Sequence, residues 1–132
     1  MIHYLRAGLL AAIVCIGITS CKKDAGPGGL ATIKGRVFAT DVTTSGNIKD
    51  SGYIGNQRVF ISVSGNTVQF DDVKTSYDGS YEFKFLRKGQ YDVWAYSDCD
   101  TCVWAQQKVI LTGIDISDKK QTVVAPDLRI IF

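Results

Sequence analysis

Histidine is almost absent from this chain of 132 residues, and the single one is His3. It stands in an amino-terminal segment that we expect to be removed, so the mature protein would contain no histidine. Catalytic triads with a histidine base and zinc sites with histidine ligands are then excluded. The serines lack an activating base for the same reason.

Strong charge of one sign is also lacking. The chain carries 15 Lys and Arg against 13 Asp and Glu, a formal net charge of +2. Removal of Arg6 with the leader leaves 14 against 13, or +1. This balance gives no electrostatic case for binding nucleic acid. The basic pairs Lys22-Lys23, Arg87-Lys88 and Lys119-Lys120 are expected to lie in solvated turns.

Proline is scarce, with 2 residues, whereas glycine reaches 13 and hydrophobic residues make up 45% of the chain. The hydrophobic content is that of a globular protein, and the length suits one domain. Frequent glycine at turns is typical of small all-β domains.

The amino terminus has the pattern of a secretory leader. Residues 1–6 include one cation, and residues 7–18 are apolar or small throughout. As a helix this run would measure only about 18 Å, too short for a bilayer core of roughly 30 Å, so we do not expect a permanent span. A signal peptide over residues 1–20 is the natural interpretation.

The residues after this run, Ile18-Thr19-Ser20-Cys21, resemble the lipobox of bacterial lipoproteins. The resemblance implies lipid attachment to Cys21, cleavage before it, and a place on the cell envelope, at the outer membrane. A plain signal peptide with a chance cysteine is the alternative. Residues 21–30 would be a lipidated flexible tether, and their Cys-Lys-Lys-Asp opening is similar to lipoproteins of the Bacteroidetes group.

Alternation of apolar and polar residues recurs through residues 31–132, and no stretch there keeps a helical period for three turns. The pattern predicts one all-β domain, a seven-stranded antiparallel Greek-key β-sandwich of immunoglobulin-like type. The expected strands lie at residues 33–39, 57–64, 69–76, 81–85, 91–95, 102–111 and 121–131.

Turn residues punctuate these segments. Asp78-Gly79 stands between two alternating runs and predicts a β-hairpin, and residues 87–90 predict a second tight turn. Residues 41–56 are polar and contain three glycines, so we expect a long connection that is either functional or mobile.

Short motifs follow one another in a recognisable order along residues 31–116. They are residues 33–37 (IKGRV), 59–63 (VFISV) and 75–83 (TSYDGSYEF), then Leu86 with Gly89, and residues 91–95 (YDVWA). In order and spacing they resemble the carboxypeptidase regulatory-like domain, a transthyretin-like sandwich related to the Cna-B modules of surface proteins. The family often has an acidic residue where Ser76 stands. The resemblance implies no catalysis, because this domain accompanies the peptidase and lacks its active site.

Cys99 and Cys102 form a C-x-x-C motif. A structural disulfide in an oxidising compartment is one interpretation, free or metal-binding thiols are a second, and a thioredoxin-like redox pair is a third. Redox chemistry would need a stabilised thiolate, typically at a helix N-terminus in a βαβ unit, and the sequence predicts neither. The aspartates around this motif and at residues 71–72 lack a calcium-loop pattern, so no metal or other cofactor is expected.

Three aromatic residues form the candidate binding site. If Tyr91, Val93 and Ala95 face the core, then Trp94 and Tyr96 face outward, and Trp104 takes the outward parity in the next segment. Paired as a hairpin, the two segments would gather these rings into one cluster, which suits a sugar face or a protein partner. The alternative is packing across the strands beneath residues 41–56.

The sequence therefore predicts a lipid-anchored envelope protein whose β-domain is not an enzyme and binds a protein or surface partner. A carbohydrate-binding module that uses Trp94, Tyr96 and Trp104 is the first alternative, and a thiol oxidoreductase that uses Cys99 and Cys102 is the second. The membrane is the expected partner through the lipid, with an envelope protein or a glycan beside it. The oligomeric state stays open.

Overall fold

The computed structural model describes residues 23–132, so the expected signal peptide and Cys21 lie outside the described residues. Within the described part the chain is all-β, without a helix, as the alternation predicts. The strands are β1 (Pro27–Val42), β2 (Ile48–Tyr53), β3 (Arg58–Val63), β4 (Asp71–Lys74), β5 (Ser80–Leu86), β6 (Gly89–Asp98), β7 (Gln106–Ile116), β8 (Thr122–Val124) and β9 (Leu128–Ile131).

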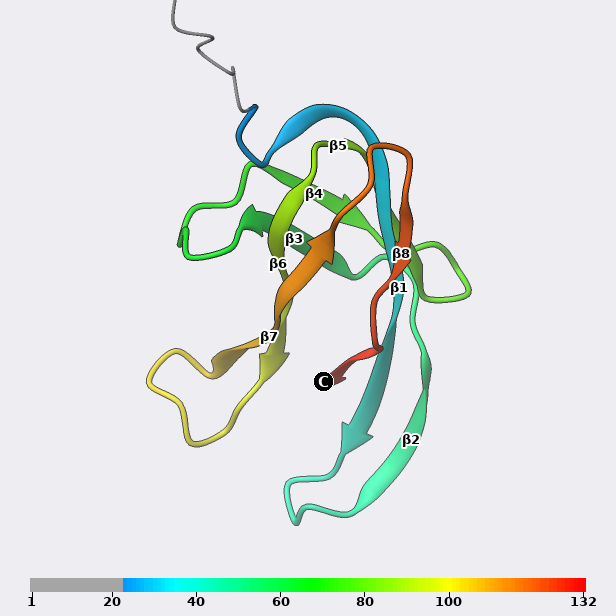
Figure 1. Ribbon diagram of the computed structural model, residues 1–132. Helices are drawn as coiled ribbons and strands as arrows, with labels where there is room; N and C mark the ends of the chain where they lie inside the picture. Colours follow the sequence, from blue (N-terminus) through cyan, green and yellow to red (C-terminus); the bar gives the residue numbers. More distant parts are fainter. Residues whose placement is uncertain (1–22) are drawn as a thin grey trace, which may run out of the picture.

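These strands form two sheets (Figure 1). The five-stranded sheet is built on the long strand β1, which pairs antiparallel with β5 through its first half and with β2 through its second. β8 and β9 pair with β1 in parallel. The four-stranded sheet has the order β4-β3-β6-β7 and is antiparallel throughout.

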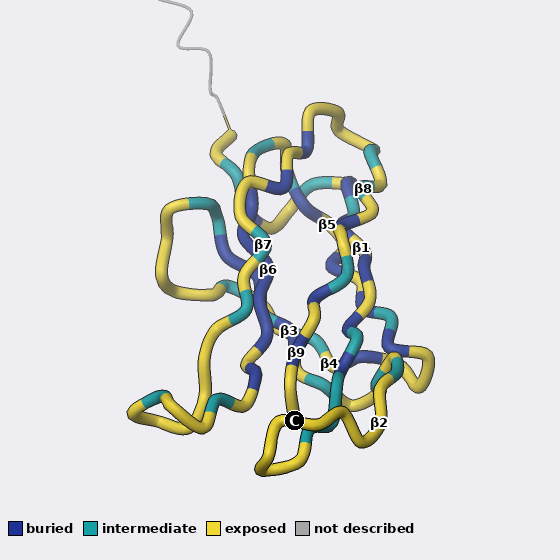
Figure 2. Tube along the Cα trace, turned by 90° about the horizontal axis from the view of Figure 1, so that it is seen from below, coloured by how far each residue is buried: buried dark blue, intermediate teal, exposed yellow. Residues whose placement is uncertain are grey.

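One hydrophobic core joins the two sheets, and buried stretches occur on strands of both (Figure 2). The alternating residues of each strand supply it, because every second side chain points to the same face. The five-stranded sheet contributes Ile33, Val37, Phe83, Leu128 and Ile130, and the four-stranded sheet contributes Val59, Ile61, Tyr91, Val93, Ile114 and Ile116.

The described residues form nine strands instead of the expected seven, and not all of them pair antiparallel. Residues 41–56 are not a plain connection, because Ile48–Tyr53 adds a strand that pairs with β1. The single last strand expected over residues 121–131 is divided into β8 and β9 by Pro126, which has no amide hydrogen to donate to a ladder. Both pieces run parallel to β1, so the pairing is mixed.

The first strand begins earlier than predicted. β1 starts at Pro27, so residues 27–30, which the sequence placed in the flexible tether, belong to the sheet. The backbone just before it is also held, since the Gly26 amide donates to the Tyr91 hydroxyl over 2.8 Å. Ala25, just before it, packs against the core.

The Asp78-Gly79 turn forms, but it does not make a hairpin. Gly79 has φ +79° and its amide donates to the Ser76 carbonyl over 2.9 Å, so the turn chemistry is as predicted. β4 before it pairs with β3, however, whereas β5 after it pairs with β1. The turn therefore carries the chain from one sheet to the other, and residues 87–88 carry it back from β5 to β6.

Alternation also fails at the end of β5. Strict alternation over residues 81–85 predicts that Phe85 faces the core with Tyr81 and Phe83, but its side chain is exposed and Leu86 is buried instead. Phe85 has φ +59°, a left-handed conformation that breaks the pleat. The register of β5 with β1 shifts at the same place.

Candidate functional site

The segments that carry the candidate aromatic residues pair as the hairpin of β6 and β7, with Asp98 paired to Gln106 at its end. Residues 99–105 make the connecting loop. The Cys99 and Cys102 sulfur atoms lie 2.06 Å apart, at disulfide distance. The Cys99 amide donates to the Ala105 carbonyl over 2.9 Å, and the Ala105 amide donates to the Cys102 carbonyl over 3.0 Å. The loop is thus closed by one covalent bond and by backbone hydrogen bonds.

Trp104 stands on this loop with 86% of its side chain exposed, next to the equally open Val103. The sequence placed Trp104 within a strand over residues 102–111, but β7 begins only at Gln106. The ring therefore lies beyond the sheet instead of on its face. None of the aromatic contacts found among the described residues includes Trp104.

Trp94 and Tyr96 lie on the outer face of the four-stranded sheet, as the parity of β6 predicts, while Tyr91, Val93 and Ala95 fill the core. Their exposure differs sharply. Tyr96 is 42% exposed, but Trp94 is only 2% exposed. The Trp94 indole nitrogen Nε1 is buried without a hydrogen-bond partner.

Phe60 on β3 covers Trp94, and sequence reasoning missed it. The two residues are paired across the strands, and their rings stack with centroids 5.7 Å apart and planes at 17°. Phe60 also meets Tyr96 edge-on, at 5.6 Å and 77°. The Lys108 ammonium lies 4.3 Å from the centre of the Trp94 ring. Alternation with the buried residues Val59 and Ile61 already predicts that Phe60 lies on the outer face of the sheet. That Phe60 lies next to Trp94 follows only from the pairing of β3 with β6.

The outer cluster is therefore Phe60, Trp94 and Tyr96, and Trp104 is separate from it. The cluster does not lie beneath residues 41–56, since β2 belongs to the other sheet. Polar side chains lie close by, including the Arg58–Asp72 ion pair at 3.0 Å. Two surfaces result: a largely covered cluster with Tyr96 at its edge, and an open ring on a closed loop.

Asp92, two residues before Trp94 on β6, links three segments of the same sheet by hydrogen bonds. Its carboxylate accepts hydrogen bonds from the Ser64 hydroxyl at 2.5 Å and from the Gly113 amide at 3.0 Å. Burial acts to raise the pKa of Asp92, but these bonds and one from the Gly65 amide outweigh it and hold the pKa below the ordinary value. The charged carboxylate thus ties β6 to the turn after β3 and to the bulge in β7.

The surroundings of the cysteine pair bear on redox chemistry. No helix lies in residues 23–132, so no helix N-terminus is present there to stabilise a thiolate.

Across the same residues no group of three His, Cys, Asp or Glu side chains could hold a metal ion. Nor does any helix in this part of the chain have the length and apolar character needed to cross a membrane.

Comparison with known proteins names no family. No family model matches the sequence, and no curated protein does. One similar solved structure is that of a candidate carbohydrate binding protein from Pseudomonas aeruginosa, at 16% identity and a TM-score of 0.43. The match covers 77% of this chain and 91% of the other.

Proposed function

We propose that this protein is a lipid-anchored component of the cell envelope whose β-domain is non-catalytic and binds a protein partner through the Trp104 loop. The observation that carries the proposal is the exposure of Trp104 beside Val103 on a loop closed by the Cys99–Cys102 pair. The anchor rests on the lipobox-like residues 18–21, which lie outside the described residues.

An exposed tryptophan on a constrained loop suits protein recognition for two physical reasons. Tryptophan buries a large apolar area in a partner's pocket and is enriched among residues that dominate binding energy. A loop closed in advance also loses less conformational entropy on binding. Val103 extends the apolar surface without adding charge. Together they form a compact contact that a pocket in another protein can enclose.

Carbohydrate binding is the second candidate, favoured by Tyr96. Its ring is partly exposed at the edge of the Phe60–Trp94 stack, beside Lys108 and the Arg58–Asp72 pair. Flat rings with polar neighbours can stack on sugars. Because Trp94 is covered and Trp104 is outside the cluster, such a site would offer single rings rather than a platform of three. Thiol oxidation by Cys99 and Cys102 ranks third, since no thiolate-stabilising helix lies among residues 23–132.

The test places a photo-crosslinking phenylalanine derivative at position 104 of the full-length protein in its native host. The matched control carries the same group at Tyr77, an aromatic position that is 95% exposed in the Asp78-Gly79 turn. A discrete protein adduct from position 104 and none from position 77 supports the proposal. Equal adducts from both positions, or none from either, contradict it.

A glycan panel separates the second candidate. Binding would be followed by tryptophan fluorescence for the wild type and for Trp104→Ala and Tyr96→Ala. Saturable sugar binding that Tyr96→Ala abolishes and Trp104→Ala leaves intact would favour the sheet surface over the loop.

The anchor is tested separately by incorporation of labelled fatty acid, which Cys21→Ala should eliminate.

A further inference from the structure

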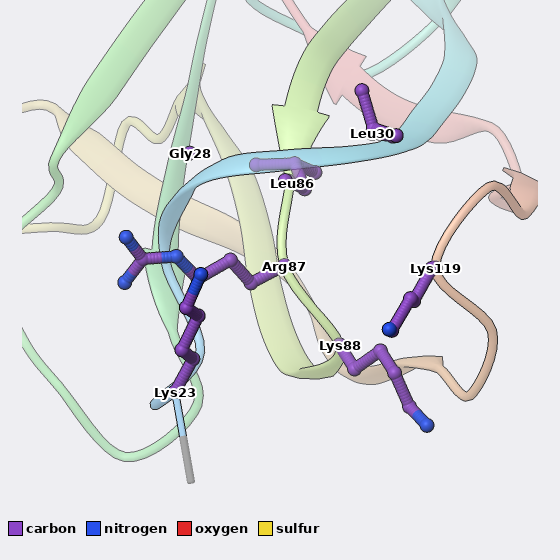
Figure 3. Close-up of a pocket in the computed structure, with 8 residues that line it drawn as sticks. Lys23, Gly28, Leu30, Leu86, Arg87, Lys88 and Lys119 are labelled. Atoms are coloured by element: carbon purple, nitrogen blue, oxygen red, sulfur yellow. The ribbon is translucent and has the colours of Figure 1, made fainter. Parts of the chain in front are cut away.

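Four basic residues from three segments that are far apart in the sequence meet at one end of the molecule. Lys23, Arg87, Lys88 and Lys119 line a single pocket of about 510 Å³, and no acidic side chain lines it (Figure 3). The sequence had placed these residues in separate solvated turns. The pocket forms because β1 begins beside the turn between β5 and β6, and the turn after β7 reaches the same end.

The positive charge of this patch is not neutralised within the described residues. The ion pairs found there join Lys49 to Asp41, Arg58 to Asp72 and Lys84 to Glu82, and none involves the four cations of the patch. Asp24 and Asp118 adjoin Lys23 and Lys119 in sequence but pair with neither. Arg87 lies against Gly28, and its Nε is buried without a hydrogen-bond partner.

Exposed apolar residues belong to the same segments of the chain as these cations. Leu30 lines the pocket and is 61% exposed. Phe85, directly before the lining residue Leu86, is 65% exposed because its left-handed backbone turns the ring away from the core. Cations beside exposed apolar groups are the composition of a surface that rests on a membrane, where the charges meet headgroups and the apolar groups reach the acyl boundary.

The position of the patch, close to the expected lipid anchor, indicates that it faces the membrane. Lys23 follows Cys21 by two residues, a distance of at most about 7 Å along an extended chain. A lipid on Cys21 would therefore hold this end of the domain at the bilayer. We propose that the patch of Lys23, Arg87, Lys88 and Lys119 docks on anionic phospholipid headgroups of the membrane that holds the lipid. This inference rests on the proposed anchor.

Docking would fix the orientation of the domain. Cys21 leads into one end of β1, whereas the loop of residues 99–105 lies at the end of β6 away from Gly89, which adjoins the patch. A domain seated on the patch therefore points Trp104 away from the bilayer and toward a partner.

The test measures vesicle binding without the lipid. The nine strands and the core described above lie within residues 23–132, so a chain that begins at Lys22 keeps each of these elements. It is sedimented with vesicles of phosphatidylcholine alone and of phosphatidylcholine with about one third phosphatidylglycerol. We expect binding only to the anionic vesicles, and weaker binding at high salt.

Variants then locate the contact. Each cation near an anionic surface strengthens binding by about fivefold, so Lys88→Gln with Lys119→Gln should weaken it by about 25-fold. The matched control, Lys49→Gln with Lys74→Gln, removes the same charge from exposed residues outside the patch and should leave binding unchanged.

Three results would overturn the inference: equal binding to neutral and anionic vesicles, no binding to either, or equal losses in the two double variants. Circular dichroism of each variant confirms that the fold is kept. Because the chain used here carries no lipid, these outcomes are independent of fatty-acid incorporation at Cys21 and of crosslinking at position 104. A negative result in the vesicle experiment is thus distinguishable from a negative result for the proposed anchor or the proposed protein partner.

Discussion

The hydroxyl group of Tyr81 occupies the space above Gly35, its cross-strand partner in β1. A Cβ atom at position 35 would stand 2.5 Å from this oxygen. Tyr81 is buried, and its hydroxyl has no hydrogen-bond partner among the described residues. Burial, helped by the negative charge of Asp127, raises the pKa of Tyr81 far above its ordinary value.

Tyr81→Phe should therefore stabilise the protein. The change removes a buried polar atom without a partner, and such an atom costs about 1–3 kcal/mol. Tyr91→Phe is the matched control with the opposite sign, because the Tyr91 hydroxyl accepts from the Gly26 amide and donates to the Arg87 carbonyl over 2.7 Å. Urea unfolding of both variants measures the difference. Destabilisation by Tyr81→Phe would contradict this description of its hydroxyl.

Gly35→Ala should destabilise the fold by about 1–3 kcal/mol, since the added methyl group overpacks the core against Tyr81. Gly52→Ala in β2 adds the same group where nothing lies within 4 Å. Its effect on the free energy of unfolding should stay within about 0.5 kcal/mol. Thermal unfolding compares the two variants. Equal melting temperatures would contradict the prediction and would show that Tyr81 moves aside to make room for the added methyl group.

Asp92 should make stability depend on acid pH. The pKa of its carboxyl group in the folded protein lies below the ordinary value of 3.8, so the stabilisation is present above that pH and is lost as the pH falls through the folded pKa. Asp92→Asn should lower the free energy of unfolding at neutral pH by about 1.5–3 kcal/mol and flatten its fall below pH 4. Asp115→Asn, at an exposed position of β7, controls for the charge change. Parallel pH profiles for the two variants would refute the role of Asp92.

The two tryptophans of the described residues should differ in fluorescence. Trp104→Phe leaves Trp94, whose buried ring should emit at shorter wavelength and resist quenching by acrylamide. Trp94→Phe leaves Trp104, whose open ring should emit at longer wavelength and quench readily. Similar quenching constants for the two variants would contradict the covering of Trp94 by Phe60 and Lys108.

Reduction of Cys99 and Cys102 should loosen the loop but keep the fold. A ring of this size stabilises by about 2 kcal/mol on the loop-entropy model. Urea unfolding with and without reductant measures the loss, and Cys99→Ser with Cys102→Ser should match the reduced protein. Catalysed reduction of insulin by the wild type, absent in this double variant, would instead support the oxidoreductase alternative.

Local patterns in the sequence were sufficient for the all-β class and for much of the core. Alternation placed Ile33, Val59 and Val93 inward because the period of two belongs to any extended chain, whatever its neighbours. It failed at Phe85, where a left-handed residue interrupts the pleat. The same alternation put Trp94 on the outer face, yet gave no information about what covers it.

What the sequence by itself determined is local: strand-forming segments, the Asp78-Gly79 turn, and the hairpin that brings Cys99 and Cys102 to one loop. The tertiary structure alone decided how the strands outside this hairpin pair. It thereby decided the passage between sheets after β4, the stacking of Phe60 on Trp94, and the meeting of Lys23, Arg87, Lys88 and Lys119. The reason is physical. Turn and alternation preferences act between near neighbours, whereas pairing and burial are set by packing among residues far apart in the chain.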